Sequence, residues 1–336
     1  MPSSQPGSRA LELLRLHPAP GSHRVALRAG ASVGVPLLTC LALDRPQWTL
    51  YAAFGSFAAL YGRDRVHAAR AMTQVSAGVA LTAAVLAGAL VAELGTTPWT
   101  LVGGAAIIAV LGQLVSDVFD WHPPGPLFVT FAFGAVGSAP PLHDSLWVPV
   151  LVSSAAAGFS VAVGAVGAVV RRQHSPWPGV RRETSWHFVR LAVAVVVSGA
   201  LAHLSGLGHP YWAMVAALAT LAGRDHHARW LRGWLRALGT LLGLLPAALL
   251  LALHLDPVAL VLTVIVLQFL TEILIGRNYG LALLFITPLA LLMGQLAVER
   301  PIGQLLLDRG IETLIGAAVA LVMVVIELRR PARHAS

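Results

Sequence analysis

The chain contains no lysine, a single cysteine and few charged residues of either sign. Charged residues make up 11% of its 336 residues, against about 25% in a typical soluble domain. With Cys40 alone, a disulfide within the chain and a metal site built from several cysteines are excluded. Hydrophobic residues account for 57% of the chain and the mean hydropathy is +0.74, so the composition excludes an ordinary soluble domain.

Long apolar runs determine the expected fold. Runs of about 20 residues, the length of a helix that crosses a bilayer, recur from Val25 almost to the C-terminus. They predict an all-α polytopic integral membrane protein with about twelve segments, surrounded by the lipid bilayer. Segments 47–62 and 210–223 are too short to cross upright, so each is either re-entrant or tilted. The predicted segments are 24–43, 47–62, 72–92, 98–116, 125–140, 146–170, 187–205, 210–223, 235–254, 257–273, 278–295 and 307–327.

The basic residues predict an orientation. The formal net charge is +8, and the arginines fall mostly in short loops between apolar runs. This placement is typical of membrane topology signals rather than of nucleic-acid binding, which we exclude. All five arginine clusters can lie on one side, so we expect both termini in the cytoplasm and the chain in the plasma (inner) membrane. The clusters are Arg9 and Arg15; Arg63, Arg65 and Arg70; Arg171, Arg172, Arg181 and Arg182; Arg224, Arg229, Arg232 and Arg236; and Arg329, Arg330 and Arg333.

An ordered series of matches indicates an internal repeat. Three residue pairs share an offset of 164 residues, and Gly-Arg-Asp recurs after each short segment. Six segments in each half would make the repeats parallel, related by an axis along the membrane normal. The pairs are His23 and His187, Pro46 and Pro210, and Trp48 and Trp212. We predict cytoplasmic tails at 1–23 and 328–336, transmembrane repeats at 24–170 (the first half) and 187–327 (the second half), and a basic cytoplasmic linker at 171–186.

Three motifs of the second half carry a family resemblance. The run from Arg236 to Gly243 reads Arg-Ala-Leu-Gly-Thr-Leu-Leu-Gly, and Asn278-Tyr279-Gly280-Leu281 follows later. The last segment contains Arg309-x-x-Glu312-Thr313-x-x-Gly316. With these motifs the chain resembles the fusaric acid resistance protein-like (aromatic acid exporter) transporters, closely over 187–327 and more weakly over 24–170. The resemblance implies inner-membrane export of aromatic or other organic acids.

The short segments predict the substrate path, because shortened segments bounded by proline or glycine at matching places often form transporter sites. The aromatic residues beside their prolines are Trp48, Tyr211 and Trp212. They either stack on an aromatic substrate or form an interfacial aromatic belt. The candidate anion-binding residues at the cytoplasmic entrance are Arg63, Arg70, Arg224, Arg236 and Arg277, joined by Asn278 and Tyr279. The alternative for these arginines is a helix that snorkels to lipid phosphates.

Two carboxylates near membrane depth could carry protons. Asp117 and Glu272 end apolar runs at matching places in the two halves, each four residues after a glutamine. Partial burial would favour proton binding, which suits a proton-coupled transporter. The alternative is a structural ion pair with Arg63, Arg224 or Arg277.

Catalytic and metal-binding patterns are not found. The histidines lack metal-ligand spacing, and the sequence has no nucleophile–base pattern and no phosphate-binding glycine loop, so we expect no enzyme, no metal and no cofactor. The expected function is efflux of a small organic acid, driven by the proton gradient. A passive organic-anion channel and a non-transporting scaffold or envelope-assembly protein are the alternatives, and a homo-oligomer is left open.

Overall fold

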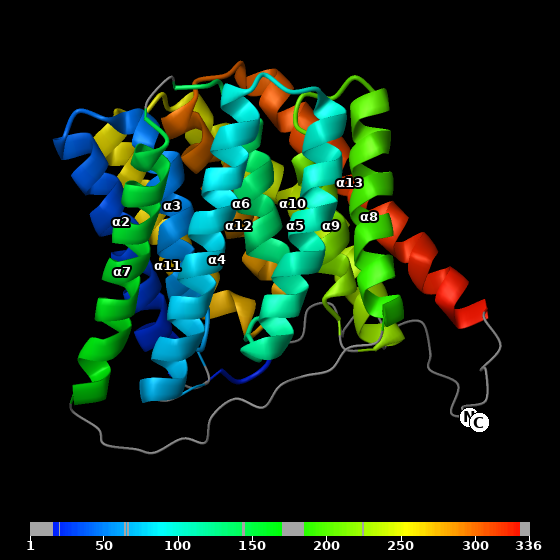
Figure 1. Ribbon diagram of the computed structural model, residues 1–336, viewed down its shortest axis with the longest axis horizontal. Helices are drawn as coiled ribbons and strands as arrows, with labels where there is room; N and C mark the ends of the chain where they lie inside the picture. The colour runs from blue at the N-terminus through cyan, green and yellow to red at the C-terminus, as the bar shows by residue number, and fades with distance from the viewer. Residues whose placement is uncertain are drawn as a thin grey trace.

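The computed structural model describes residues 16–19, 21–63, 65, 67–142, 145–169, 185–223 and 225–329, and within them all regular structure is helical. This confirms the all-α prediction. The helices stand side by side in one bundle (Figure 1). The predicted tails and the linker 171–186 fall largely outside the described residues. The helices are α2 (Ser22–Ala42), α3 (Thr49–Ser56), α4 (His67–Glu93), α5 (Pro98–Val118), α6 (Leu127–Gly137), α7 (Trp147–Val169), α8 (Ser185–Leu204), α9 (Tyr211–Leu221), α10 (His226–Ala252), α11 (Pro257–Ile275), α12 (Tyr279–Ala297) and α13 (Ile302–Arg329), with 3-10 turns η1 (Pro46–Trp48) and η2 (Phe57–Leu60) flanking α3.

Length separates the membrane-crossing helices from the short ones. Within the described residues, nine helices are long and apolar enough to cross a membrane: α2, α4, α5, α7, α8, α10, α11, α12 and α13. The longest, α13 with 28 residues, runs obliquely behind the bundle (Figure 1), as a helix longer than the bilayer thickness does. Helices α3 and α9 are short, as the sequence predicted. Helix α6 is short as well, with 11 residues, because prolines stand on both sides of it.

Helix contacts recur in the same pattern in the two halves. In the first half α4 packs against α6 and α7, and α3 packs against α7. In the second half α10 packs against α12 and α13, and α9 packs against α13. Between the halves, α2 packs against α11 and α5 against α8. The two halves therefore bury one continuous core, while large apolar side chains such as Leu151 and Leu245 remain exposed on the outside, where lipid would cover them.

Two glycines of α10 allow its close approach to α12. A Cβ added to Gly239 would lie 2.8 Å from the backbone oxygen of Gly280, and one added to Gly243 would lie 2.7 Å from the backbone oxygen of Leu283. Neither glycine lines the central cavity described below. Their spacing of four residues thus serves helix packing, the usual role of this pattern in membranes.

We expect Gly243→Ala to destabilise the bundle by about 1–3 kcal/mol, because the new methyl group overlaps backbone atoms that cannot rotate away. The measurement is thermal unfolding of the purified protein in detergent. Gly103→Ala on α5 is the matched control, since a Cβ at Gly103 would meet no atom within 4 Å. Equal unfolding temperatures for the two variants would contradict the close-packing role of Gly243.

A buried ion network joins three helices at the end of the bundle where α8 and α10 begin. Glu327 of α13 accepts hydrogen bonds from Arg190 of α8 and Arg229 of α10, each at 3.0 Å. Arg229 also donates to the backbone oxygen of Gly223, 3.0 Å away. Arg229, a member of the same arginine cluster as Arg232 and Arg236, is therefore held by structural contacts.

Candidate functional site

A cavity of about 720 Å³ lies at the centre of the bundle and is lined by both halves. This volume falls within the range of about 300–1,000 Å³ typical of small-molecule sites. The first half contributes residues of α2, α3, η2 and α6, and the second half contributes residues of α9, α10, α11, α12 and α13. The short helices α3, α6 and α9 all line the cavity, so the helices too short to cross a membrane upright contribute to the site.

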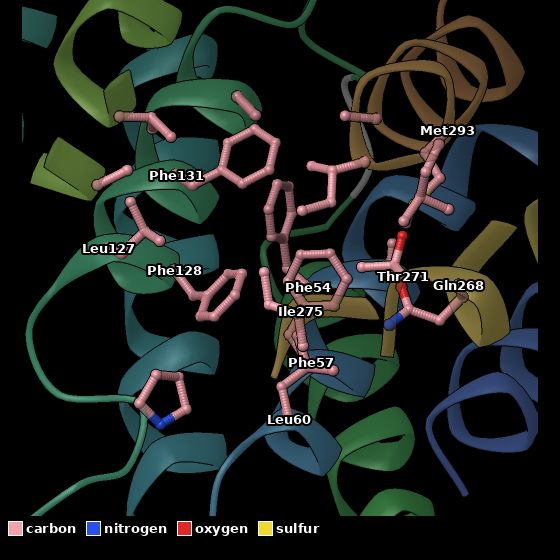
Figure 2. A pocket seen from close by; sticks show the side chains of 18 of the residues that line it. Phe54, Phe57, Leu60, Leu127, Phe128, Phe131, Gln268, Thr271, Ile275 and Met293 are labelled. Carbon is pink, nitrogen blue, oxygen red and sulfur yellow. The ribbon is translucent and has the colours of Figure 1, made fainter. Parts of the chain in front are cut away.

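Four phenylalanines form an aromatic wall on the first-half side of the cavity (Figure 2). Phe54 and Phe57 come from α3 and η2, and Phe128 and Phe131 come from α6. The rings of Phe54 and Phe131 meet edge to face with centroids 4.9 Å apart, and those of Phe57 and Phe128 with centroids 5.3 Å apart. Edge-to-face contacts fix the orientation of the rings, so the wall is a defined surface rather than a fluid lining.

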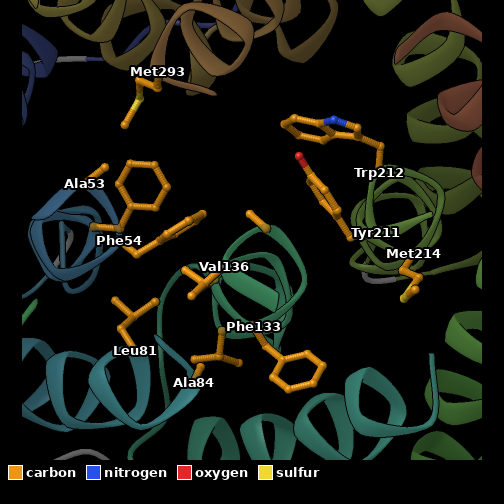
Figure 3. Close-up of a cluster of buried hydrophobic side chains, with 14 of the residues drawn as sticks. Ala53, Phe54, Leu81, Ala84, Phe133, Val136, Tyr211, Trp212, Met214 and Met293 are labelled. Carbon is orange, nitrogen blue, oxygen red and sulfur yellow. The ribbon is translucent and has the colours of Figure 1, made fainter. Parts of the chain in front are cut away.

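Tyr211 and Trp212 continue this surface from α9. Their rings extend from the helix into the central space, whereas Met214 points the other way (Figure 3). The ring of Trp212 lies 4.8 Å from that of Phe131, which connects the two halves across the cavity. Trp48, the expected counterpart in the first half, does not line the cavity; the guanidinium of Arg45 lies over its ring at 5.5 Å.

Arg309 of α13 places a positive charge directly beside this aromatic surface. Its guanidinium carbon lies 3.8 Å from the centroid of the Trp212 ring, a cation–π contact. The residue is only 1% exposed, yet it lines the cavity. Among the described residues, its Nε and Nη1 have no hydrogen-bond partner. Among these residues, two donors of Arg309 are therefore left unused close to the cavity.

Arg236 of α10 is the second buried arginine of the cavity, and α10 packs against α13. It is 4% exposed, and its Nη1 donates to the hydroxyl of Tyr279 at 3.3 Å. Its Nε has no hydrogen-bond partner among the described residues. Arg232, one turn earlier, stacks its guanidinium over the ring of Tyr279 at 4.7 Å. We call Arg236 and Arg309 the arginine pair.

An ion pair lies at the end of the cavity near η2. Arg63 donates from Nη2 to Oε2 of Glu272 at 2.8 Å, and both residues line the cavity. Gln268, one turn before Glu272, donates to its Oε1 at 3.4 Å. This contact joins the loop after η2 to the end of α11, and it is the Arg63 pairing that the sequence left open as an alternative.

Asp117 has the same local arrangement but a different environment. Gln113, one turn earlier, donates to its Oδ1 at 2.7 Å, as Gln268 does for Glu272. Asp117 is 6% exposed and does not line the cavity. A proton-carrying role for Asp117 and Glu272 stays a prediction.

The other predicted residues that the structure describes do not line the cavity. Arg70 donates to the backbone oxygens of Gly62 and Arg65, and Arg277 donates to Oγ of Ser22 at 3.5 Å. Asn278 caps α12 by accepting from the backbone N–H of Leu281 at 3.0 Å. Arg224 lies outside the described residues. The predicted residues that line the cavity are Arg63, Tyr211, Trp212, Arg236, Glu272 and Tyr279.

Sequence reasoning missed Arg309 and the aromatic wall. An arginine inside an apolar segment is a signal by itself, since charges at membrane depth are costly and usually functional. Arg309 met that criterion but was read only as part of a motif. Phenylalanines in apolar segments carry no such signal, because lipid-facing phenylalanines look the same. Among the described residues no group of histidine, cysteine, aspartate and glutamate side chains could hold a metal ion.

Comparisons with known proteins agree with the motifs. Residues 193–323 match the family described as fusaric acid resistance protein-like, which confirms the resemblance for the part of the chain from α8 to α13. An uncharacterized protein of Synechocystis sp. is 32% identical over 135 residues, which are 40% of this chain and 18% of that protein. The chain thus matches less than a fifth of that relative's length. No solved structure matches the chain.

Proposed function

We propose that the chain is a membrane transporter that exports aromatic or other organic acids, as the match of its second half to the fusaric acid resistance protein-like family implies. The observation that carries the proposal is the arginine pair set into an aromatic cavity. The aromatic wall with Tyr211 and Trp212 would hold a planar apolar ring, and the guanidinium groups would hold a carboxylate.

The energetics of the arginine pair favour an anionic cargo. A buried guanidinium without an ionic partner is costly at membrane depth, and the cost falls when an anion binds beside it. The planar fork of arginine accepts both oxygens of a carboxylate at once. An organic anion bound in the cavity would therefore supply the ionic partner that these guanidinium groups lack among the described residues.

The path would run between two parallel repeats, 24–170 and 187–327. The recurring helix contacts support this arrangement, since α3, α4, α6 and α7 pack among themselves as α9, α10, α12 and α13 do. We propose that the Arg63–Glu272 end faces the cytoplasm of the plasma (inner) membrane, with both termini there, following the arginine clusters. In this orientation the ion pair would close the cytoplasmic entrance.

The proton gradient is the proposed energy source. The inside-negative potential that accompanies it favours the exit of an anion by about 2.3 kcal/mol per charge at 100 mV. In cells that overproduce the chain, low accumulation of radiolabelled benzoate is expected, and an uncoupler should restore it.

Proteoliposomes test the proposal directly. Vesicles loaded with labelled benzoate are expected to release it faster than protein-free vesicles when an inside-negative potential is imposed. Unlabelled benzoate outside should accelerate the release further, because a carrier returns faster when loaded. Release without this acceleration would indicate a passive anion channel. Absence of release above that of protein-free vesicles would favour a non-transporting scaffold.

A further inference from the structure

A second buried polar cluster lies beside the arginine pair, where α13 meets the residues just before α9. Its members are Asp308, Glu312 and His209, which are 3%, 0% and 8% exposed. The backbone N–H of His209 donates to Oε1 of Glu312 at 2.8 Å. Oδ2 of Asp308 lies 3.2 Å from Nδ1 of His209 and accepts from the backbone N–H of Gly208 at 3.3 Å. The proposed function uses none of these three side chains.

The cluster has no cation of its own at neutral pH. Burial lowers the pKa of His209 below its ordinary value, and the nearby charge of Arg300 acts in the same direction, while Asp308 acts in the opposite one. The imidazole is therefore neutral at pH 7, and its contact with Asp308 is a hydrogen bond rather than an ion pair. Two carboxylates, Asp308 and Glu312, remain one helical turn apart, where two negative charges would repel each other.

Glu312 is the member whose charge acts on the anion site. It follows Arg309 by three residues on α13, a spacing that places both on one helix face, and their charges interact. Among the described residues, Oε2 of Glu312 has no hydrogen-bond partner, as is true of two nitrogens of Arg309. Glu312 itself does not line the cavity. It thus acts on a bound anion through its charge rather than by contact.

The surroundings contain few other charged groups. The charged or titratable groups that act on Glu312 are Tyr211 from α9, Asp308 and Arg309 from α13 itself, and His209 and Arg300 from the loops. Arg236 from α10 acts on Arg309. Helix α8 also packs against α13, but its Arg190 pairs with Glu327 and its His203 stacks on Trp99. Arg300 also acts on Glu312 and lines the cavity, but Arg309 acts more strongly and stands three residues before Glu312 on the same helix, so we take Arg309 as the main cation for which Glu312 and a bound anion compete.

We propose that Glu312 is a proton-binding site linked to the organic-anion site at Arg309. When Glu312 is ionised, its negative charge partly compensates the positive charge of Arg309 and repels an incoming anion. When Oε2 takes up a proton, Arg309 is left to the anion alone. Binding of the anion therefore raises the affinity of Glu312 for a proton. Protonation of Glu312 raises the affinity for the anion by the same factor. The inference rests on the proposed function, since it concerns the regulation of the same cavity.

Stronger anion binding at lower pH would suit an exporter of weak acids. Such acids cross the membrane in their neutral form and release protons inside, so acid load and anion load rise together in the cytoplasm. A site that binds the anion more tightly at lower pH responds to both at once. Its response follows from Glu312, so it is absent where this carboxylate is replaced by an amide.

The experiment measures benzoate binding to the purified full chain in nanodiscs from about pH 6 to pH 9, a range over which benzoate stays ionised. The affinity of the natural protein is expected to fall by about tenfold or more as pH rises, the size of a typical coupling between two sites. Glu312→Gln is expected to bind with the affinity that the natural protein shows at low pH, at every pH. The amide oxygen still accepts the N–H of His209, so the junction with α9 keeps its hydrogen bond.

Two further measurements keep the outcomes distinct. Titration of the natural protein in two buffers of different ionisation enthalpy reports proton uptake on binding without any substitution, and its absence would overturn the linkage. Asp308→Asn is the matched control, and it should retain the pH dependence; if it loses the dependence while Glu312→Gln keeps it, the assignment to Glu312 is overturned. No benzoate binding at any pH would contradict the proposed function as well, whereas pH-independent binding would contradict the linkage alone.

Discussion

Arg309→Gln is expected to remove the binding of an organic anion while leaving the protein at least as stable as before at the low pH at which Glu312 carries a proton. Loss of a buried charged partner costs a complex about 2–5 kcal/mol, which is more than tenfold in affinity. The reason is geometric, since Arg309 lies 3.8 Å from the Trp212 ring centroid and has two nitrogens without a partner among the described residues. Affinity for benzoate, measured by calorimetry, and release from proteoliposomes should fall together.

Although Arg309→Gln should lose affinity for the anion, it should not lose stability. When Glu312 carries a proton, Arg309 is a buried charge without an ion pair among the residues that the structure describes, so at about pH 6 a neutral side chain of similar length removes a cost. The thermal unfolding temperature in detergent should therefore stay constant or rise. Arg329→Gln, at the exposed end of the same helix, is the control for the lost charge. Unchanged benzoate affinity in Arg309→Gln would remove Arg309 from the site.

Arg63→Gln is expected to destabilise the protein more than Glu272→Gln does. The side chain of Glu272 is 4% exposed, whereas that of Arg63 is 21% exposed. Removing Arg63 strands a buried carboxylate, and breaking a buried pair from one side costs about 3–5 kcal/mol. Removing Glu272 leaves an arginine that can reach water, so the cost is smaller. Thermal unfolding of the two variants under identical conditions gives the comparison.

The double variant completes this test. With both charges replaced, no buried charge is stranded, so the protein should recover much of the stability lost in Arg63→Gln. Arg24→Gln, at an exposed position of α2, shows the effect of losing a charge without a buried partner. If the two single losses simply add in the double variant, Arg63 and Glu272 do not act as a pair across the two halves.

The parts of the fold that could be predicted from sequence are those that the membrane imposes directly. A bilayer requires apolar runs of a set length that contain few charges. The predicted segments 98–116 and 257–273 therefore agree within a few residues with the helices α5 and α11 of the structure. Tyr211, Trp212 and Arg236 could be predicted because each stands at the edge of an apolar run, where its type is unusual. Segment 125–140 is found as α6, but its shortness was not predicted, because flanking prolines shorten a helix whose residues are largely apolar.

The cavity itself could not be predicted, because it depends on which sides of the helices meet. Phe131 lines it while Phe133, two residues later, does not, and apolar composition gives both the same character. Asp117 and Glu272 share a motif, yet only Glu272 reaches the cavity. Their difference arises from neighbouring helices, since α11 packs against α2 and α12, whereas α5 packs against α8 and α6. The residues around Asp117 and Glu272 do not indicate which helices will pack against α5 and α11.

The complete burial of α9 has a consequence for how this helix tolerates change. All of its residues from Tyr211 to Leu221 are buried, so an apolar helix of the membrane domain has no side chain in lipid. Scales of membrane insertion would reward leucine at Ala213 or Ala216, because they score contact with hydrocarbon. Yet α13 approaches there so closely that a Cβ on Gly316 would lie 2.8 Å from that of Ala216. Packing against neighbouring helices thus limits which residues α9 can contain, and hydrophobicity alone does not predict which of them can be replaced.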